Sequence, residues 1–229
     1  MRDLSRNSTA AMIRPGIITR DLLPFGSCRA RRTDEIVYLV GTSLEGLEAL
    51  FEVIAFASGR EYLGHTRRDK AACLILDLQL PDMSGLDLQA QLAGNEHLPV
   101  IFVSHDCDIP SAVRAMKAGA LEFFTAPVDP SALVDAIRAA LAQDRASRQT
   151  KAELEALQKR YCLLTPREKE VLPLLAGGLL NKQAACILGV TEVTLQVHRG
   201  QIMRKMQAES FAELVRMAVT LGIPYREVA

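Results

Sequence analysis

Hydrophobic runs of four to six residues alternate with amphipathic segments through the first two thirds of the chain. The runs are rich in residues that favour β-strands. Strands that alternate with helices imply βαβ units, hence a parallel sheet covered by helices on both faces. The predicted strands are Ile36–Val40, Ala72–Leu76, Val100–Val103, Leu121–Phe124 and a candidate fifth, Val53–Phe56, and the predicted helices are Ser84–Leu92, Pro110–Ala118 and Ser131–Ala142.

The last of these helices has no clear end. A polar stretch, Gln143–Lys151, follows it without a helix-breaking residue. Leu154, Leu157 and Tyr161 come next at i, i+3 and i+7, which places them on one helical stripe. We therefore expect the helix to continue toward Tyr161. The stripe is a candidate dimer seam, and packing on the chain's own domain is an equally good interpretation.

Four short helices with readable start and stop signals are predicted after residue 160. Thr165-Pro166-Arg167-Glu168 is a capping box with proline at the first helical position, so a helix begins there. The further signals are Gly177-Gly178 as a stop, Asn181 as the next cap, Gly189 as the next stop, a third helix over Thr191–Met206, and a second capping box, Ser210-Phe211-Ala212-Glu213, that opens the fourth. Two short helices joined through a glycine turn form a helix-turn-helix, whose second helix reads DNA.

The third of these helices has two chemically different faces when residues are placed about 100° apart. One stripe consists of Leu195, Ile202 and Met206, which we expect to pack inward. The opposite stripe consists of Val193, Gln196, Val197, Gly200 and Arg204. It carries few bulky polar groups and includes a glycine, which suits close approach to a base edge.

Side chains on and beside this stripe suit two kinds of DNA contact. Gln196 could hydrogen-bond an adenine, and Val197 could contact a thymine methyl group. The candidates for contacts that position the protein on the duplex are Thr194, Arg199, Arg204 and Lys205, with Lys182 of the preceding helix also assigned to DNA binding. The alternative for Arg199 and Lys205 is a solvated charge, and His198 is interpreted as a hydrogen-bonded structural residue.

Three motifs in this order resemble the LuxR-type DNA-binding domain of FixJ-like response regulators. They are Leu164–Leu172 (LTPREKEVL), Asn181–Ala185 (NKQAA) and Val193–Arg199 (VTLQVHR), within a likeness that covers about residues 160–225. The resemblance implies a transcription regulator that binds paired half-sites on double-stranded promoter DNA as a homodimer. Two departures matter: the family often has lysine where this chain has Gln196, which puts a phosphate or guanine contact in doubt, and Pro173 should bend or shorten the first helix.

Two earlier segments resemble response-regulator receiver domains. Cys73–Gly85 (CLILDLQLPDMSG) is similar to the phospho-acceptor segment and Ala112–Ala120 (AVRAMKAGA) to the fourth helix, within a likeness that covers roughly residues 34–145. The resemblance implies a flavodoxin-like (CheY-like) α/β fold with a doubly wound parallel sheet. It makes Asp77 the phospho-acceptor position, at the strand ends where such sheets bind ligands. It also places Ser104 and Phe123 at the receiver's switch positions.

The usual phosphorylation site lacks two of its parts here. Receivers place an acidic pair after the first strand to hold Mg²⁺, an ion that prefers carboxylate oxygens, but Val40-Gly41-Thr42-Ser43 contains none. Ala126 stands where a lysine normally precedes the proline after the fifth strand. The first two strands are also about eight residues closer than in relatives, so the first helix, around Leu44–Leu50, should lose about two turns. We infer a pseudo-receiver that keeps the fold without the phosphorylation cycle, with no metal and no cofactor.

Two other functions remain open at this point. The chain could regulate a kinase or another regulator by protein contact without binding DNA, or it could be a conventional regulator phosphorylated on Asp77 with atypical metal ligands. Asp106 and Asp108 could approach a cation, although a solvated acidic loop is the simpler interpretation. Cys107 in the same loop could sense redox state, but it has no basic neighbour to favour the thiolate. No pairing of a nucleophile with a base points to an enzyme.

The chain of 229 residues has 27 Lys and Arg against 27 Asp and Glu, a net charge of zero that by itself would argue against a nucleic-acid partner. The distribution of these charges along the chain changes that interpretation. Residues 1–33 hold seven basic and two acidic side chains, residues 34–144 seven and seventeen, and residues 145–229 thirteen and eight. Neutrality therefore excludes nothing about DNA. The expected organisation is a flexible basic extension (1–33), a receiver-like domain (34–143), a linker helix (144–160) and a helix-turn-helix domain (161–229).

Composition also bears on location. Hydrophobic runs are too short to span a bilayer, and no apolar stretch near Met1 is long enough for a signal peptide, so we expect a cytoplasmic protein without membrane contact. For the basic extension (1–33), a targeting peptide or an arm that contacts phosphates is an alternative to a flexible tail. Five cysteines, at positions 28, 73, 107, 162 and 186, show no paired spacing, so we expect them to be reduced and mostly buried.

Overall fold

The computed structural model describes residues 35–42, 44, 46–93, 98–105 and 108–224. The chain divides into two compact units, with the boundary between Arg148 and Gln149, inside the predicted linker helix. We call them the amino-terminal unit and the carboxyl-terminal unit and describe each by itself. The predicted basic extension and the loop residues Asp106 and Cys107 lie outside the described residues.

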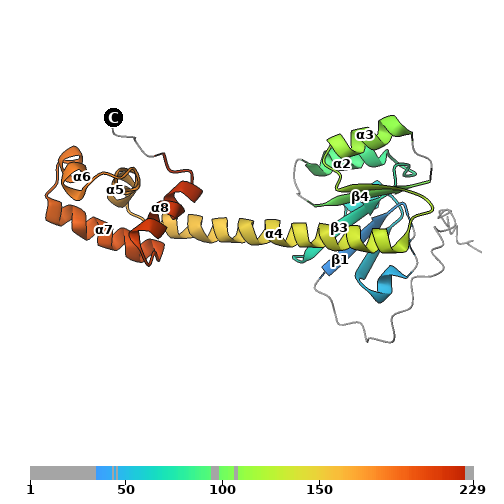
Figure 1. Ribbon diagram of the computed structural model, residues 1–229, viewed down its shortest axis with the longest axis horizontal. Coiled ribbons are helices and arrows are strands. Elements are labelled where there is room, and N and C mark those ends of the chain that lie inside the picture. Colours follow the sequence, from blue (N-terminus) through green and yellow to red (C-terminus); the bar gives the residue numbers. More distant parts are fainter. Residues whose placement is uncertain (1–34, 43, 45, 94–97, 106–107, 225–229) are drawn as a thin grey trace, which may run out of the picture. The chain divides into compact units, whose positions relative to one another are not determined.

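The amino-terminal unit is built on a five-stranded parallel sheet in the order β2-β1-β3-β4-β5 (Figure 1). The strands are β1 (Glu35–Val40), β2 (Glu52–Phe56), β3 (Ala71–Leu76), β4 (Val100–Ser104) and β5 (Glu122–Thr125). The chain adds one strand on one side of β1, then crosses over and adds three on the other. This order confirms the predicted doubly wound fold, with its ligand-binding edge at the carboxyl ends of the strands.

Helices cover both faces of this sheet (Figure 1). One face is covered by α1 (Gly59–Leu63), α2 (Gly85–Ala93) and α3 (Ile109–Lys117), and the other by a single 3-10 turn, η1 (Leu47–Ala49), and the first part of α4 (Pro130–Cys162). All six side chains of β3 are buried, because each face of this central strand lies under a helical layer.

The connection between β1 and β2 is unusually short. Among the described residues of this connection, the three-residue turn η1 is the one helical element, which confirms the predicted loss of turns from the first helix. Leu47 of this turn is fully buried and still covers the sheet. The five-residue helix α1 was not predicted, because it is too short to show a period. Its amino end is capped by Ser58, whose Oγ accepts the Glu61 N–H at 3.2 Å.

α4 is one continuous helix of 33 residues, as the uninterrupted pattern predicts. Its first part is fixed to the amino-terminal unit by Asp144, which is only 4% exposed and accepts the Ala72 N–H at 2.9 Å. Arg145 and Arg148 add ion pairs to Glu35 and Asp69. No helix among the described residues is long and apolar enough to cross a membrane.

Of the three cysteines that the structure describes, two differ from the expectation of burial. Cys73 in β3 is buried, and desolvation, with the charge of Asp144, raises the pKa of its thiol to about 12. Cys162 and Cys186 are exposed. Their helices bury other positions, since α4 turns Leu157 inward and α6 turns Ala184 and Ala185 inward.

The carboxyl-terminal unit contains the end of α4 and four helices: α5 (Pro166–Ala176), α6 (Asn181–Leu188), α7 (Glu192–Met206) and α8 (Phe211–Thr220). Leu195, Ile202 and Met206 are fully buried in its core, which confirms the predicted inward stripe. Leu157 and Tyr161 pack in the same core. The stripe on α4 therefore serves its own domain at these two positions.

The helix caps confirm some predictions and correct others. Thr165 and Glu168 form the predicted capping box, with Glu168 Oε2 accepting the Thr165 N–H at 2.7 Å. Asn181 does not cap α6: it is the first helical residue, and Gln183 Oε1 accepts the Leu180 N–H at 2.9 Å. At α8 the box is half formed, because the Glu213 side chain bonds to the N–H of Glu209.

Pro173 was predicted to bend or shorten the first helix, and the structure shows no shortening of α5. The helix continues past it to Ala176 and ends at Gly177, whose N–H donates to the Pro173 carbonyl at 3.0 Å. A proline removes the hydrogen bond that its own nitrogen would donate, and its ring crowds the carbonyl four residues earlier. The burial of Val171, Leu172 and Leu175 around it keeps the helix intact.

Candidate functional site

The carboxyl edge of the sheet brings Asp77 and Ser104 together, as their places after β3 and at the end of β4 predict. Ser104 is 1% exposed, and its hydroxyl donates to Asp77 Oδ1 at 2.9 Å. The Gln79 N–H donates to the same oxygen at 3.3 Å, and the Asp77 N–H donates to the Val40 carbonyl at 3.1 Å. Asp77 is thus oriented as a hydrogen-bond acceptor that joins three segments of this edge.

Gly41 occupies the place after β1 where receivers have their acidic pair. Its φ of +74° is a left-handed conformation that side chains rarely adopt. A Cβ built at Gly41 would lie 2.3 Å from Leu80 Cδ2 and 3.5 Å from Asp77 Cβ. The Leu80 side chain therefore fills the space that a side chain at position 41 would need beside Asp77.

A magnesium ion does not fit the residues at this edge. Mg²⁺ binds carboxylate oxygens in near-octahedral geometry, and Gly41 and Thr42 offer no carboxylate beside Asp77. Across the described part of the chain, no group of three or more His, Cys, Asp or Glu side chains could hold a metal ion. Asp108, an alternative ligand, caps α3 and accepts the Ser111 N–H at 3.0 Å.

The other two receiver positions lie at or after β5. Ala126 follows the strand, its N–H donates to the Ser104 carbonyl at 2.9 Å, and its methyl group packs against the core under α4. An alanine supplies no positive charge there. Phe123 is half-buried and stacks on Phe102, with ring centroids 5.8 Å apart and planes inclined by 18°.

Asp82 is a structural residue of this edge that the sequence did not reveal. Its two carboxylate oxygens accept the N–H groups of Gly59 and Arg60 at 3.0 and 2.9 Å. Partial desolvation acts to raise the pKa of Asp82, but these amides and the Arg60 charge hold that pKa below its usual value. The contact fastens the loop after β3 to the start of α1.

In the carboxyl-terminal unit, α7 presents the outward stripe that its sequence predicts. Val193 and Val197 are 71% and 58% exposed, and Gln196 and Arg204 are also exposed. A Cβ built at Gly200 would meet no heavy atom within 4 Å, so the fold itself does not require a glycine there. The absence of a side chain leaves the helix backbone open to a partner.

Two of the predicted positioning residues have partners inside the unit. Lys205 Nζ donates to Glu168 Oε2 at 2.6 Å, and Glu168 is only 4% exposed. Desolvation acts to raise the pKa of Glu168, but the Lys205 ammonium and the Thr165 amide hold that pKa below its usual value. The Arg199 guanidinium lies 4.3 Å from the ring centroid of Phe211.

The alternative interpretation of Arg199 and Lys205 as merely solvated charges is therefore wrong. Lys205 joins α7 to α5, and Arg199 joins α7 to α8 and, through Asn181 at 3.4 Å, to α6. Thr194 and Lys182 are exposed. The Thr194 N–H donates to Thr191 Oγ1 at 3.2 Å, which caps the amino end of α7.

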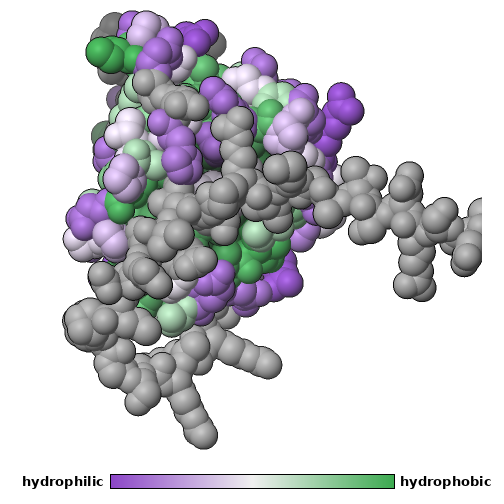
Figure 2. Space-filling model, turned by 90° about the vertical axis from the view of Figure 1, so that its right-hand side faces the viewer, coloured by the Kyte–Doolittle hydropathy of each residue, from purple (hydrophilic) through white to green (hydrophobic). Residues whose placement is uncertain are grey.

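The amino-terminal unit also exposes apolar side chains on α3. Ile109, Val113 and Met116 are 81%, 45% and 44% exposed and share one helical stripe. On the side of the unit where α4 begins, hydrophilic and hydrophobic residues are interspersed over the visible described surface (Figure 2).

Comparison with known proteins accounts for both units. Residues 33–138 match the family model of the response regulator receiver domain, and residues 163–218 match that of the bacterial regulatory proteins of the luxR family. Nodulation protein W of Bradyrhizobium diazoefficiens is 47% identical over 173 residues, 75% of this chain and 76% of that protein. Response regulator protein TodT of Pseudomonas putida is 40% identical over 195 residues, 81% of this chain and 86% of that protein.

Two further comparisons agree. Transcriptional regulatory protein FixJ of Azorhizobium caulinodans is 35% identical over 189 residues, 77% of this chain and 90% of that protein. The solved structure of response regulator StyR is 40% identical in sequence. It superposes with a TM-score of 0.71, and the matched region covers 81% of this chain and 98% of StyR. The chain therefore belongs to the two-component response regulators that combine a receiver domain with a LuxR-type DNA-binding domain.

Proposed function

We propose that this response regulator controls transcription without phosphorylation of its receiver. The family assigns DNA-binding transcriptional regulation to the chain, and the proposal concerns how that activity is governed. The observation that carries it is the arrangement beside Asp77: Gly41 in a left-handed conformation, with the Leu80 side chain filling the space where a carboxylate would stand.

Phosphoryl transfer needs positive charge around the moving group, supplied in receivers by Mg²⁺ and a lysine. Neither Gly41 nor Ala126 can contribute to such an environment. Asp77 instead accepts hydrogen bonds from Ser104 and Gln79, and so orders the carboxyl edge of the sheet. We assign it this structural role.

For DNA recognition we propose α7 as the reading helix. Gln196 would hydrogen-bond an adenine and Val197 would contact a thymine methyl group, while Gly200 lets the helix approach the base edges. Thr194, Arg204 and Lys182 are exposed and suit phosphate contacts. Arg199 and Lys205 would act indirectly, by holding α7 in place through Phe211 and Glu168.

We further propose that the protein acts as a homodimer on paired half-sites, because a two-fold symmetric protein matches a repeated DNA element. The exposed stripe of Ile109, Val113 and Met116 supports a self-association surface on the receiver. Light scattering of the full chain with Val113→Glu tests it. A loss of dimer is expected, and an unchanged mass would remove α3 from the interface.

The experiment for the DNA-reading proposal is a binding assay with the full chain on promoter fragments over a range of salt concentrations. Gln196→Ala should alter the preference among sequences, because a bidentate base contact contributes about 1–3 kcal/mol of discrimination. Gln143→Ala on α4 is the matched control, since it makes the same change at an exposed position of the other unit. If Gln196→Ala leaves both affinity and preference unchanged, α7 is not the reading helix.

A further inference from the structure

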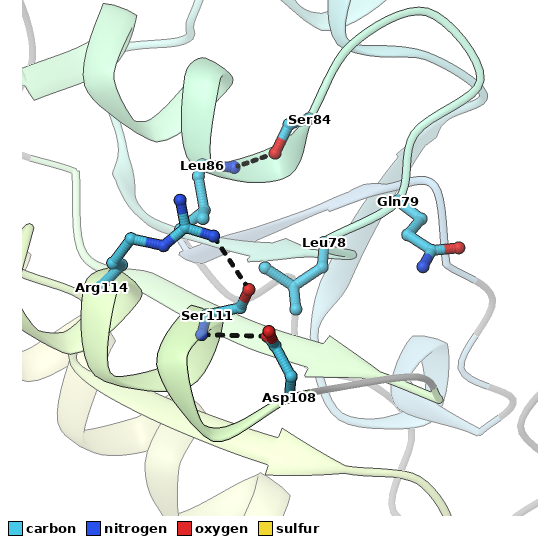
Figure 3. Close-up of a pocket in the computed structure, with 7 residues that line it drawn as sticks. All are labelled: Leu78, Gln79, Ser84, Leu86, Asp108, Ser111 and Arg114. Carbon is cyan, nitrogen blue, oxygen red and sulfur yellow. Dashed lines mark hydrogen bonds between the residues drawn. The ribbon is translucent and has the colours of Figure 1, made fainter.

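Arg167, near the start of α5, bonds to a helix other than its own. Its Nη2 donates to the Leu188 carbonyl oxygen at 2.5 Å, and its Nη1 donates to Glu170 Oε2 at 2.6 Å. Arg114 of α3 differs, because the hydrogen bond drawn from its guanidinium ends on Ser111 of the same helix (Figure 3). A bond between two elements, unlike a bond within one helix, fixes where the second element lies.

The Leu188 carbonyl lies at the turn between the two helices of the helix-turn-helix. Leu188 is the last residue of α6, and Gly189 follows it with a φ of +66° that turns the chain. The Val190 N–H donates back to the Ala185 carbonyl at 3.0 Å, and Thr191 then caps α7. Two residues separate Leu188 from this cap, so a shift of the Leu188 carbonyl would move the start of α7.

A guanidinium suits this position chemically. The last carbonyl groups of a helix have no partner within the helix and carry a partial negative charge. Arg167 supplies both an N–H donor and a positive charge to one of them. Because the guanidinium is a rigid planar fork, the bond from Nη1 to Glu170 sets the direction of Nη2. The end of α6 is thereby held in a defined direction from α5.

Two successive residues of α5 hold the helix-turn-helix at different places. Glu168 pairs with Lys205 near the carboxyl end of α7, whereas Arg167 holds the turn before α7 begins. Recognition helices contact base edges with the residues of their amino-terminal part. Gln196 and Val197 lie in that part of α7. Of the two contacts, the one made by Arg167 therefore lies nearer along the chain to the residues that would read DNA.

We propose that Arg167 is a positioning residue for DNA recognition, which places the start of α7 by holding the carboxyl end of α6. The inference rests on the proposed role of α7 as the reading helix. The side chains of Arg167 and Glu170 are 38% and 55% exposed, so their ion pair contributes little to the free energy of unfolding. Removal of Arg167 should therefore affect sequence-specific DNA binding more than it affects stability.

The test is fluorescence anisotropy of the full chain with two DNA probes. One is the duplex recovered by selection from a random-sequence library, and the other contains the same bases in scrambled order. Arg167→Met should lower the affinity for the selected duplex about tenfold, which is the effect of losing about one base contact, and should leave the affinity for the scrambled duplex nearly unchanged. The slope of log affinity against log salt should also stay unchanged, because Arg167 bonds to protein groups and not to a phosphate.

Two further variants complete the experiment. Glu170→Gln should also weaken binding to the selected duplex, and it should add no further loss to Arg167→Met, because Glu170 acts through Arg167. Arg138→Met makes the same change as Arg167→Met at an exposed arginine of the amino-terminal unit. It should leave both affinities unchanged.

Three results would overturn the proposal. An equal loss of affinity for both duplexes with a slope smaller by about 1 would make Arg167 a phosphate contact. A lower midpoint of thermal unfolding with unchanged affinity for both duplexes would leave Arg167 only a role in stability. Additive losses in Arg167→Met and Glu170→Gln would show that the two side chains act independently.

Failure of this proposal can be distinguished from failure of the reading helix itself. If Gln196→Ala changes the preference among sequences and Arg167→Met does not, the role of Arg167 alone is overturned. If Gln196→Ala leaves affinity and preference unchanged, α7 is not the reading helix, and the role of Arg167 is overturned with it.

Discussion

Gly200→Ala separates a folding role of the reading helix from a DNA-contacting role. In a helix interior, alanine is favoured over glycine by about 0.8–1.0 kcal/mol. The added Cβ has no heavy atom within 4 Å, so no clash offsets this gain. For a domain of this size, we expect the midpoint of thermal unfolding to rise by about 4–8 °C per kcal/mol.

DNA affinity should change in the opposite direction. If the backbone at Gly200 approaches the base edges, an added methyl group overpacks the interface and costs about 1–3 kcal/mol, which lowers the affinity about 5- to 150-fold. Fluorescence anisotropy with a promoter fragment measures the DNA affinity of the Gly200→Ala protein. Ser147→Ala is the control, because it raises helix propensity at an exposed position of α4 that belongs to the amino-terminal unit. A Gly200→Ala chain that is more stable and binds DNA with unchanged affinity would refute the assignment of this stripe to DNA.

Three further predictions concern single side chains. Asp144→Ala should lower the free energy of unfolding by about 1–3 kcal/mol in chemical denaturation, because it leaves the buried Ala72 amide unpaired. Asp135→Ala, at an exposed position of the same helix, should change the free energy of unfolding by less than about 0.5 kcal/mol. Lys205→Met should lower the free energy of unfolding at pH 7 by about 1–3 kcal/mol, because it leaves the Glu168 carboxylate without its partner. The salt dependence of DNA binding should stay unchanged, because Lys205 is paired to Glu168. The pKa of Glu168 is lowered in the folded chain, so the stability from this pair is present above the ordinary glutamate pKa of about 4.3 and is lost as the pH falls through the lowered value. In thermal melts at decreasing pH, the midpoints of Lys205→Met and of the unaltered protein should therefore converge. Arg204→Met should reduce the slope of log affinity against log salt by about 1, and an unchanged slope would exclude a phosphate contact.

The sheet could be predicted from the sequence because its strands combine hydrophobic runs with β-formers, and helical patterns separate several of them. Every strand lies within one residue of its predicted range at either end. Short elements escaped prediction, since α1 has too few residues to show a period. The stripe on α4 shows the same limit: periodicity identifies Leu157 as buried but does not say which surface covers it.

The candidate site was predictable in part for a topological reason. Asp77 and Ser104 meet because parallel strands end at one edge of the sheet, which the βαβ pattern implies. The packing of Leu80 against Gly41 depends on a left-handed backbone that no local motif signals. Lys205 and Glu168 lie 37 positions apart, so their ion pair follows only from the packing of α7 on α5.

Incubation of the full chain with acetyl phosphate and Mg²⁺, followed by intact mass measurement, tests the central claim most directly. A relative whose receiver retains the acidic pair serves as the positive control, and Asp77→Asn identifies the position. The arrangement of Gly41, Leu80 and Ala126 around Asp77 predicts that the mass of this chain stays unchanged while the relative gains a phosphoryl group. A stable gain of one phosphoryl group that disappears in Asp77→Asn would contradict a receiver that works without phosphorylation.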